Sequence, residues 1–106
     1  MPLYLYRFGF ESPRKFRNNA VHAWDDEDSQ GVLVDAPDEA AAFAWGQEVS
    51  ERFIRLMFKD EGLSWQKLGY ASWIEPQVET WPDLQRIAVG TLPDFSSWLR
   101  PYEGEA

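Results

Sequence analysis

The side chains that most often perform chemistry in proteins are scarce in this sequence. It has one histidine, His22, and no cysteine. A catalytic triad or a zinc site would therefore have to be built without the residues most often used for either, and thiolate chemistry is excluded. The 18 aspartates and glutamates could act in acid–base pairs, but nothing in their spacing selects two of them. No phosphate-binding glycine loop, nucleophile elbow or dinucleotide fingerprint occurs. We assign no catalytic residue and expect no cofactor.

One acidic run, Asp25-Asp26-Glu27-Asp28, has part of the spacing of a metal site. Counted from Asp26, the sequence matches the first half of a calcium-binding loop as far as Gly31. The twelfth position of such a loop should be a bidentate glutamate, and here it falls on Pro37. We therefore predict no metal site and interpret the run as a solvated turn.

Charge is distributed unevenly along the chain. Ten basic and 18 acidic residues give a net charge of -8. Residues 1–20 carry four basic residues and one acidic residue, whereas the remainder carries six basic and 17 acidic residues. Most of this surface would repel nucleic acid, so we expect no nucleic-acid partner. A net negative charge keeps many small proteins soluble. A more specific interpretation is that the charge attracts a basic protein partner.

The sequence specifies one helix strongly, over residues 36–61. Pro37 suits its first turn, and Gly62 can supply the left-handed residue that follows a helix. Glu48 with Arg52 and Glu51 with Arg55 are spaced as i,i+4 ion pairs on the polar face, at a wet surface. At 100° per residue, the apolar face contains Ala42, Trp45, Gly46, Val49, Phe53, Leu56 and Met57. We predict that Gly46 lies where the helix backbone approaches the sheet closely.

The stretch Leu3 to Phe10 is rich in β-formers and predicts a central strand. Its four aromatic residues alternate along one face, which is typical of core lining. The string Arg7-Phe8-Gly9-Phe10 matches part of the aromatic strand motif of RNA-recognition domains. The match fails because Glu11-Ser12-Pro13 follows instead of an apolar continuation.

Residues 11–30 allow three structures. Ser12-Pro13 could start a helix with Phe16, Ala20 and Trp24 on one face, or the stretch could be a loop. The third structure, which we favour, is a hairpin: Ala20 to Trp24 forms a strand and turns through residues 25–30 into a short strand ending at Val34.

Residues 63–74 predict a further strand, closed by Pro76 and carrying apolar groups on both faces. Gly69 would mark a bulge or a close approach within it. We expect a turn at Trp81-Pro82-Asp83 and a loose tail from Pro101. Between these two features, residues 86–91 predict a last strand and residues 93–99 a short helical turn.

Together these elements predict one α+β domain over residues 1–106. Its sheet would have three to five strands, antiparallel or mixed, with the long helix across one face. No apolar run is long enough to span a membrane, and no signal for secretion precedes the first strand. We therefore expect a cytoplasmic protein with no membrane partner.

Six tryptophans are more than one helix-to-sheet layer hides comfortably, and tryptophan commonly anchors interfaces. Our first hypothesis is a protein-interaction module that binds a protein partner, or itself as a homodimer, through an aromatic sheet face. The binding residues would be Trp65 and Trp73, with Asp25, Asp26, Glu27 and Asp28 steering a basic partner. The rival is a small-ligand binder, or an enzyme that uses carboxylates in an aromatic pocket. A flat aromatic patch flanked by acids favours the first, and a pocket with two converging acids favours the rival.

Overall fold

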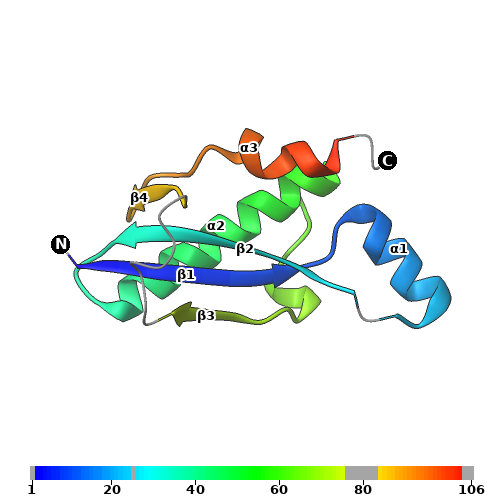
Figure 1. Ribbon diagram of the computed structural model, residues 1–106, viewed down its shortest axis with the longest axis horizontal. Helices are drawn as coiled ribbons and strands as arrows, with labels where there is room; N and C mark the ends of the chain where they lie inside the picture. Colours follow the sequence, from blue (N-terminus) through cyan, green and yellow to red (C-terminus); the bar gives the residue numbers. More distant parts are fainter. Residues whose placement is uncertain (1, 25, 76–83, 104–106) are drawn as a thin grey trace.

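A four-stranded mixed sheet is the centre of the computed structural model, which describes residues 2–24, 26–75 and 84–103 (Figure 1). The first strand pairs antiparallel with its neighbours on both sides, and the last strand joins the edge in parallel. The α+β fold with one long helix on a mixed sheet, predicted from the sequence, is confirmed. In order across the sheet, the strands are β3 (Ser72–Glu75), β1 (Leu3–Phe10), β2 (Asp28–Asp35) and β4 (Arg86–Ala88).

The long helix α2 (Glu39–Phe58) packs on one face of this sheet. It begins later than predicted because the Asp38 carboxylate accepts the N–H of Ala41 at 2.8 Å and caps the helix. It also ends earlier, because Lys59, and not Gly62, is the left-handed residue after the last turn, with a φ of 55°. The buried residues of α2 include Ser50, Glu51 and Ile54, which the predicted apolar face omitted. Leu56, which was placed on that face, is exposed.

The aromatic residues of β1 form the floor of the core beneath α2. Tyr6, Phe8 and Phe10 are fully buried, as the alternation predicted. A Cβ atom built on Gly46 would lie 2.3 Å from the ring of Tyr6, closer than any real contact allows. The predicted close approach of the α2 backbone to the sheet at Gly46 is therefore confirmed.

The favoured hairpin over residues 20–34 is wrong. A helix, α1 (Pro13–His22), follows β1 instead, and β2 then pairs with β1 along its whole length. Buried Ser12 caps this helix by accepting the N–H of Lys15 at 3.3 Å, and Pro13 occupies its first turn. Because β1 already supplies the antiparallel partner of β2, no second strand is needed between them. Figure 1 shows α1 beyond the end of the sheet.

The predicted strand over residues 63–74 is also mostly wrong, since only its end belongs to β3. A short 3₁₀ turn, η1 (Gln66–Leu68), precedes it. The buried Glu51 carboxylate accepts the N–H groups of Trp65 and Gln66 at 3.1 and 3.0 Å, so these groups cannot join a strand ladder. Gly69 ends the turn with a φ of 83°, and nothing lies within 4 Å of an added Cβ, so it marks neither a bulge nor a close approach.

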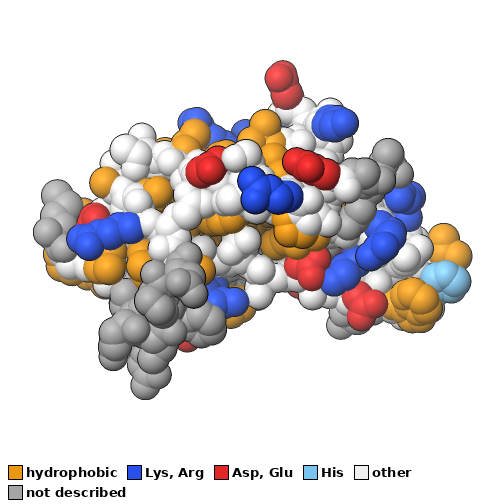
Figure 2. All heavy atoms as spheres, turned by 45° about the horizontal axis from the view of Figure 1, so that its top comes forward, with side chains coloured by type: hydrophobic (Ala, Val, Ile, Leu, Met, Phe, Trp, Pro, Cys, Tyr) orange, Lys and Arg blue, Asp and Glu red, His pale blue; other side chains and the backbone are white. Residues whose placement is uncertain are grey.

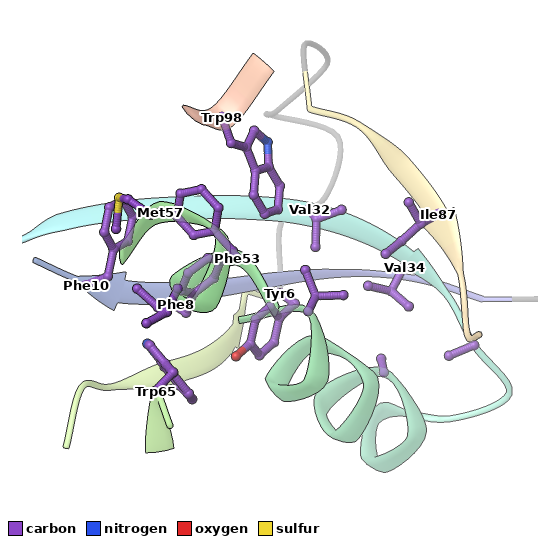
Figure 3. Close-up of a cluster of buried hydrophobic side chains, with 14 residues drawn as sticks. Tyr6, Phe8, Phe10, Val32, Val34, Phe53, Met57, Trp65, Ile87 and Trp98 are labelled. Carbon is purple, nitrogen blue, oxygen red and sulfur yellow. The ribbon is translucent and has the colours of Figure 1, made fainter. Parts of the chain in front are cut away.

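The C-terminal segment packs beside α2, on the same face of the sheet, where Trp98 contacts both Phe8 and Phe53. The predicted last strand is shorter than expected, because a turn at Gly90 (φ 94°) follows β4. The predicted helical turn is present as α3 (Phe95–Leu99), and Figure 3 shows Trp98 over Phe53 in the core. The tail is not loose at Tyr102, which ends the 3₁₀ turn η3 (Arg100–Tyr102) and packs edge-on against Phe10. The turn expected at residues 81–83 lies outside the described residues.

Candidate functional site

Trp65, one of the two predicted anchors, lies inside the core. It is 1% exposed, and its ring meets Phe8 edge-on with centroids 5.9 Å apart (Figure 3). Its indole N–H donates to the carbonyl oxygen of Gly9 at 2.9 Å. In this conformation Trp65 links the segment after α2 to β1 and presents no surface to a partner.

Trp73, the other predicted anchor, lies on the opposite face of the sheet. In the antiparallel ladder it pairs with Arg7, whose neighbours Tyr6 and Phe8 point toward α2. Paired residues share a face, so Trp73 points away from α2. It is 40% exposed, and its indole N–H donates to the Glu75 carboxylate at 2.8 Å. The two tryptophans therefore do not form one aromatic surface.

The acidic run is tied to α1. Asp26 and Glu27 are exposed, Asp25 lies outside the described residues, and Asp28 begins β2. Asp28 forms an ion pair with Lys15 at 2.7 Å, and its other oxygen accepts the Tyr102 hydroxyl at 3.2 Å. Part of the run's negative charge is thus neutralised within the chain.

Polar contacts hold α1 in place, since it contains no buried residue. The Asn19 amide donates to the Glu11 carboxylate and, at 2.8 Å, to the carbonyl oxygen of Asp26. Glu11 also accepts the hydroxyl of Tyr70. Partial burial, and then this bond to a carboxylate, raise the pKa of Tyr70 above its ordinary value. Asn19 thus connects α1 to the segments on both sides of it in the chain.

A groove of about 660 Å³ opens where α1 meets the last turn of α2 and the C-terminal segment, and we call it the α1–α2 groove. Its walls are mostly apolar. Phe16 and Leu56 are 43% and 50% exposed, and the Phe16 ring packs edge-on against Phe58 with centroids 5.9 Å apart. The lining residues are Pro13, Phe16, Arg17, Leu56, Met57, Phe58, Lys59, Leu99, Tyr102 and Glu103.

Two basic side chains, those of Arg17 and Lys59, also line the α1–α2 groove. Neither Arg17 nor Lys59 has an ion pair within the described part of the chain. Glu103 is the single carboxylate of the lining residues that the structure describes. Figure 2 shows several Lys and Arg side chains at the right of the view, with Asp and Glu side chains beside them, and others spread over the rest of this face. The groove can therefore remove apolar groups from water and attract negative charge beside them.

Sequence reasoning missed this groove. The sequence places Phe16 on only one of three alternative structures, Leu56 on the apolar face of the long helix and Tyr102 in a loose tail. One usable signal was present: the Ser12-Pro13 helix start places Phe16 on a helix that has too few apolar residues to be buried. The meeting of the three segments could not be read from any one stretch of sequence.

Comparison of the chain with protein-family models, with curated proteins and with solved structures finds no match. Within residues 2–24, 26–75 and 84–103, no three His, Cys, Asp or Glu side chains are grouped to hold a metal ion. Over the same residues, no helix combines the length and apolarity that crossing a membrane requires. The function must therefore be argued from the site itself.

Proposed function

We propose that this protein is a protein-interaction module and that its α1–α2 groove binds a segment of a partner protein. The observation that carries the proposal is that two large apolar side chains, Phe16 and Leu56, stay about half exposed on the walls of one groove. Most other large apolar side chains that the structure describes lie in or against the core. The exposed exceptions, which do not line this groove, are Val21, Trp24, Trp73, Val89 and Leu92. Covering apolar surface yields about 25 cal/mol per Å², so a partner gains affinity by filling the groove.

A small-ligand binder is the second candidate, because the groove volume of about 660 Å³ falls within the range of roughly 300–1,000 Å³ typical of ligand sites. The enzyme form of this alternative requires two converging carboxylates. Glu103 alone supplies a carboxylate among the described lining residues, which favours binding over acid–base chemistry.

The test compares two leucines of similar exposure. Leu56 lines the groove, whereas Leu92 is 40% exposed and lies outside it, which makes Leu92→Ser the matched control for Leu56→Ser. Each variant is first checked for folding by circular dichroism and thermal melting. Affinity capture from the source cell with quantitative mass spectrometry should then lose a stoichiometric protein with Leu56→Ser and keep it with Leu92→Ser.

Other outcomes assign the groove differently. A parent dimer that Leu56→Ser converts to a monomer, measured by light scattering, would make the partner a second copy of the chain. A small molecule seen by native mass spectrometry on the parent, and lost from Leu56→Ser, would support the ligand alternative. Equal capture of the same proteins by both variants would contradict the proposal.

The acidic run is the basis of a separate proposal, the steering of a basic partner. Asp26 and Glu27 are exposed, and charges at the rim of an interface mainly raise the association rate. Replacing the two exposed acids, Asp26 and Glu27, with Asn and Gln keeps the Asp28–Lys15 ion pair and should slow association with a captured partner and weaken its salt dependence. If the association rate of the variant equals that of the parent across a salt series, the acidic run is only a solvated loop.

A further inference from the structure

We propose that the occupant of the α1–α2 groove is an amphipathic helix of a partner protein with acidic residues beside its apolar face. This inference rests on the proposed function and adds the partner's conformation and charge. The conformation follows from the walls of the groove and the charge from its rim.

The walls favour a helix over an extended peptide. The side chains that line the groove belong mainly to α1, to the last turn of α2 and to the C-terminal turns, whose backbone groups are largely bonded within their own segments. A peptide that binds by adding a strand needs a free strand edge, and none of the described lining residues belongs to a strand. A helix satisfies its own backbone and can place apolar residues at i and i+4 between Phe16 and Leu56.

The charge of the rim is opposite to the charge of the whole chain. The chain carries a net charge of -8, yet the described residues that line the groove include two cations, Arg17 and Lys59, and one carboxylate, Glu103. At physiological ionic strength, exposed charges are screened beyond a Debye length of about 8 Å, so the local cations decide what the groove attracts. Arg17 and Lys59 lie among the lining residues, where carboxylates flanking an apolar helix face would reach them.

The experiment uses a displayed library of helical peptides. One face of each peptide carries Leu, Ile, Phe or Ala, and the flanking positions vary among Asp, Glu, Gln, Lys and Arg. Selection against the full chain should enrich Asp and Glu at the flanks. Synthetic forms of the selected peptides should bind the parent at least about 10-fold more tightly than their Lys-flanked counterparts, with an affinity that falls as salt rises.

Three variants separate this inference from the proposed function. Arg17→Gln combined with Lys59→Gln should abolish the preference for acidic flanks, whereas Lys67→Gln, which removes one charge from exposed η1, should keep it. Leu56→Ser should weaken all selected peptides. Loss of binding with Leu56→Ser but equal binding of acidic and basic peptides overturns the inference and leaves the proposed function standing. Peptides that bind Leu56→Ser as well as the parent overturn both. A parent that selects no peptide overturns the inference alone, because the capture experiment tests the proposed function independently.

Discussion

Two phenylalanines on helices, Phe53 and Phe16, show how differently the two halves of this molecule are organised. Phe53 on α2 is fully buried and makes ring contacts with Phe8, Phe10 and Trp98. Phe16 on α1 is nearly half exposed and, within the described part of the chain, meets one ring, that of Phe58. The difference arises because α2 crosses the face of the sheet, whereas α1 lies beyond the end of the sheet and meets the last turn of α2 and the C-terminal segment instead. Apolar residues hold the first region together, and in the second two of them, Phe16 and Leu56, remain about half exposed.

The largest expected effect is the loss of the Phe53 ring. Phe53→Ala would leave a cavity between β1 and α3 and should lower the free energy of unfolding by roughly 3–5 kcal/mol. Chemical unfolding followed by circular dichroism measures it. A protein as stable as the parent would show that the core does not depend on this contact.

Glu51 extends the comparison to polar residues. Its buried carboxylate holds the segment that carries Trp65, so Glu51→Ala leaves the N–H groups of Trp65 and Gln66 without their acceptor. The expected loss is roughly 2–4 kcal/mol of unfolding free energy. Glu48→Ala is the control on the same helix: it breaks an exposed pair with Arg52 and should cost less than about 0.5 kcal/mol. Equal losses in the two variants would contradict the structural role of Glu51.

Alkaline pH should weaken the core through Tyr6. Burial raises the pKa of its phenol from 10.0 to about 12, so the folded chain keeps a proton that the unfolded chain releases. This stabilisation is complete below about pH 10 and is lost as the pH rises through 12, an effect of about 2–3 kcal/mol. Urea unfolding across this range measures it.

Tyr6→Phe provides the control, because phenylalanine cannot ionise. The variant should lose less stability between pH 10 and 12 than the parent does. The pKa of Tyr70 is raised as well, so replacing both tyrosines with Phe should flatten the pH dependence further. If the parent and the variants lose the same unfolding free energy between pH 10 and 12, ionisation of these tyrosines is not the cause of the loss.

Gly46 tests the close approach of α2 to the sheet. Alanine favours helix by about 0.5–1 kcal/mol over glycine, but its methyl group would overlap the buried ring of Tyr6. We therefore expect Gly46→Ala to destabilise by about 1–2 kcal/mol. At exposed Ala44 the reverse change, Ala44→Gly, should also destabilise, through helix propensity alone. A higher melting temperature for Gly46→Ala would mean that the ring of Tyr6 shifts to make room for the added methyl group.

The smallest expected effect is at Phe16. Phe16→Ala removes a half-exposed ring from a helix with no buried residue and should cost less than about 1 kcal/mol of unfolding free energy. The same variant should weaken binding in the α1–α2 groove. A loss as large as that of Phe53→Ala would show that α1 is part of the core, and the comparison between the two regions would fail.

The sequence by itself determined the elements whose signal is local. The alternating aromatics predicted β1 over residues 3–10, and the 3.6-residue pattern predicted α2 and its contact at Gly46. Burial of these faces follows from periodicity, which a short window of sequence contains. Ser12-Pro13 is also a local signal, and it indicates the start of α1. The same stretch is compatible with a hairpin, which only the pairing of β1 with β2 excludes.

Tertiary structure decided the rest, because the deciding contacts join residues far apart in the chain. The local pattern of residues 63–71 predicts a strand. The strand does not form there because the carboxylate of Glu51 accepts the N–H groups of Trp65 and Gln66. The same contact turns Glu51, spaced like a surface ion-pair residue, into a buried one. The α1–α2 groove exists only where α1, the end of α2 and Tyr102 converge. Each of these segments is ambiguous alone, since its burial depends on partners that local sequence patterns do not specify.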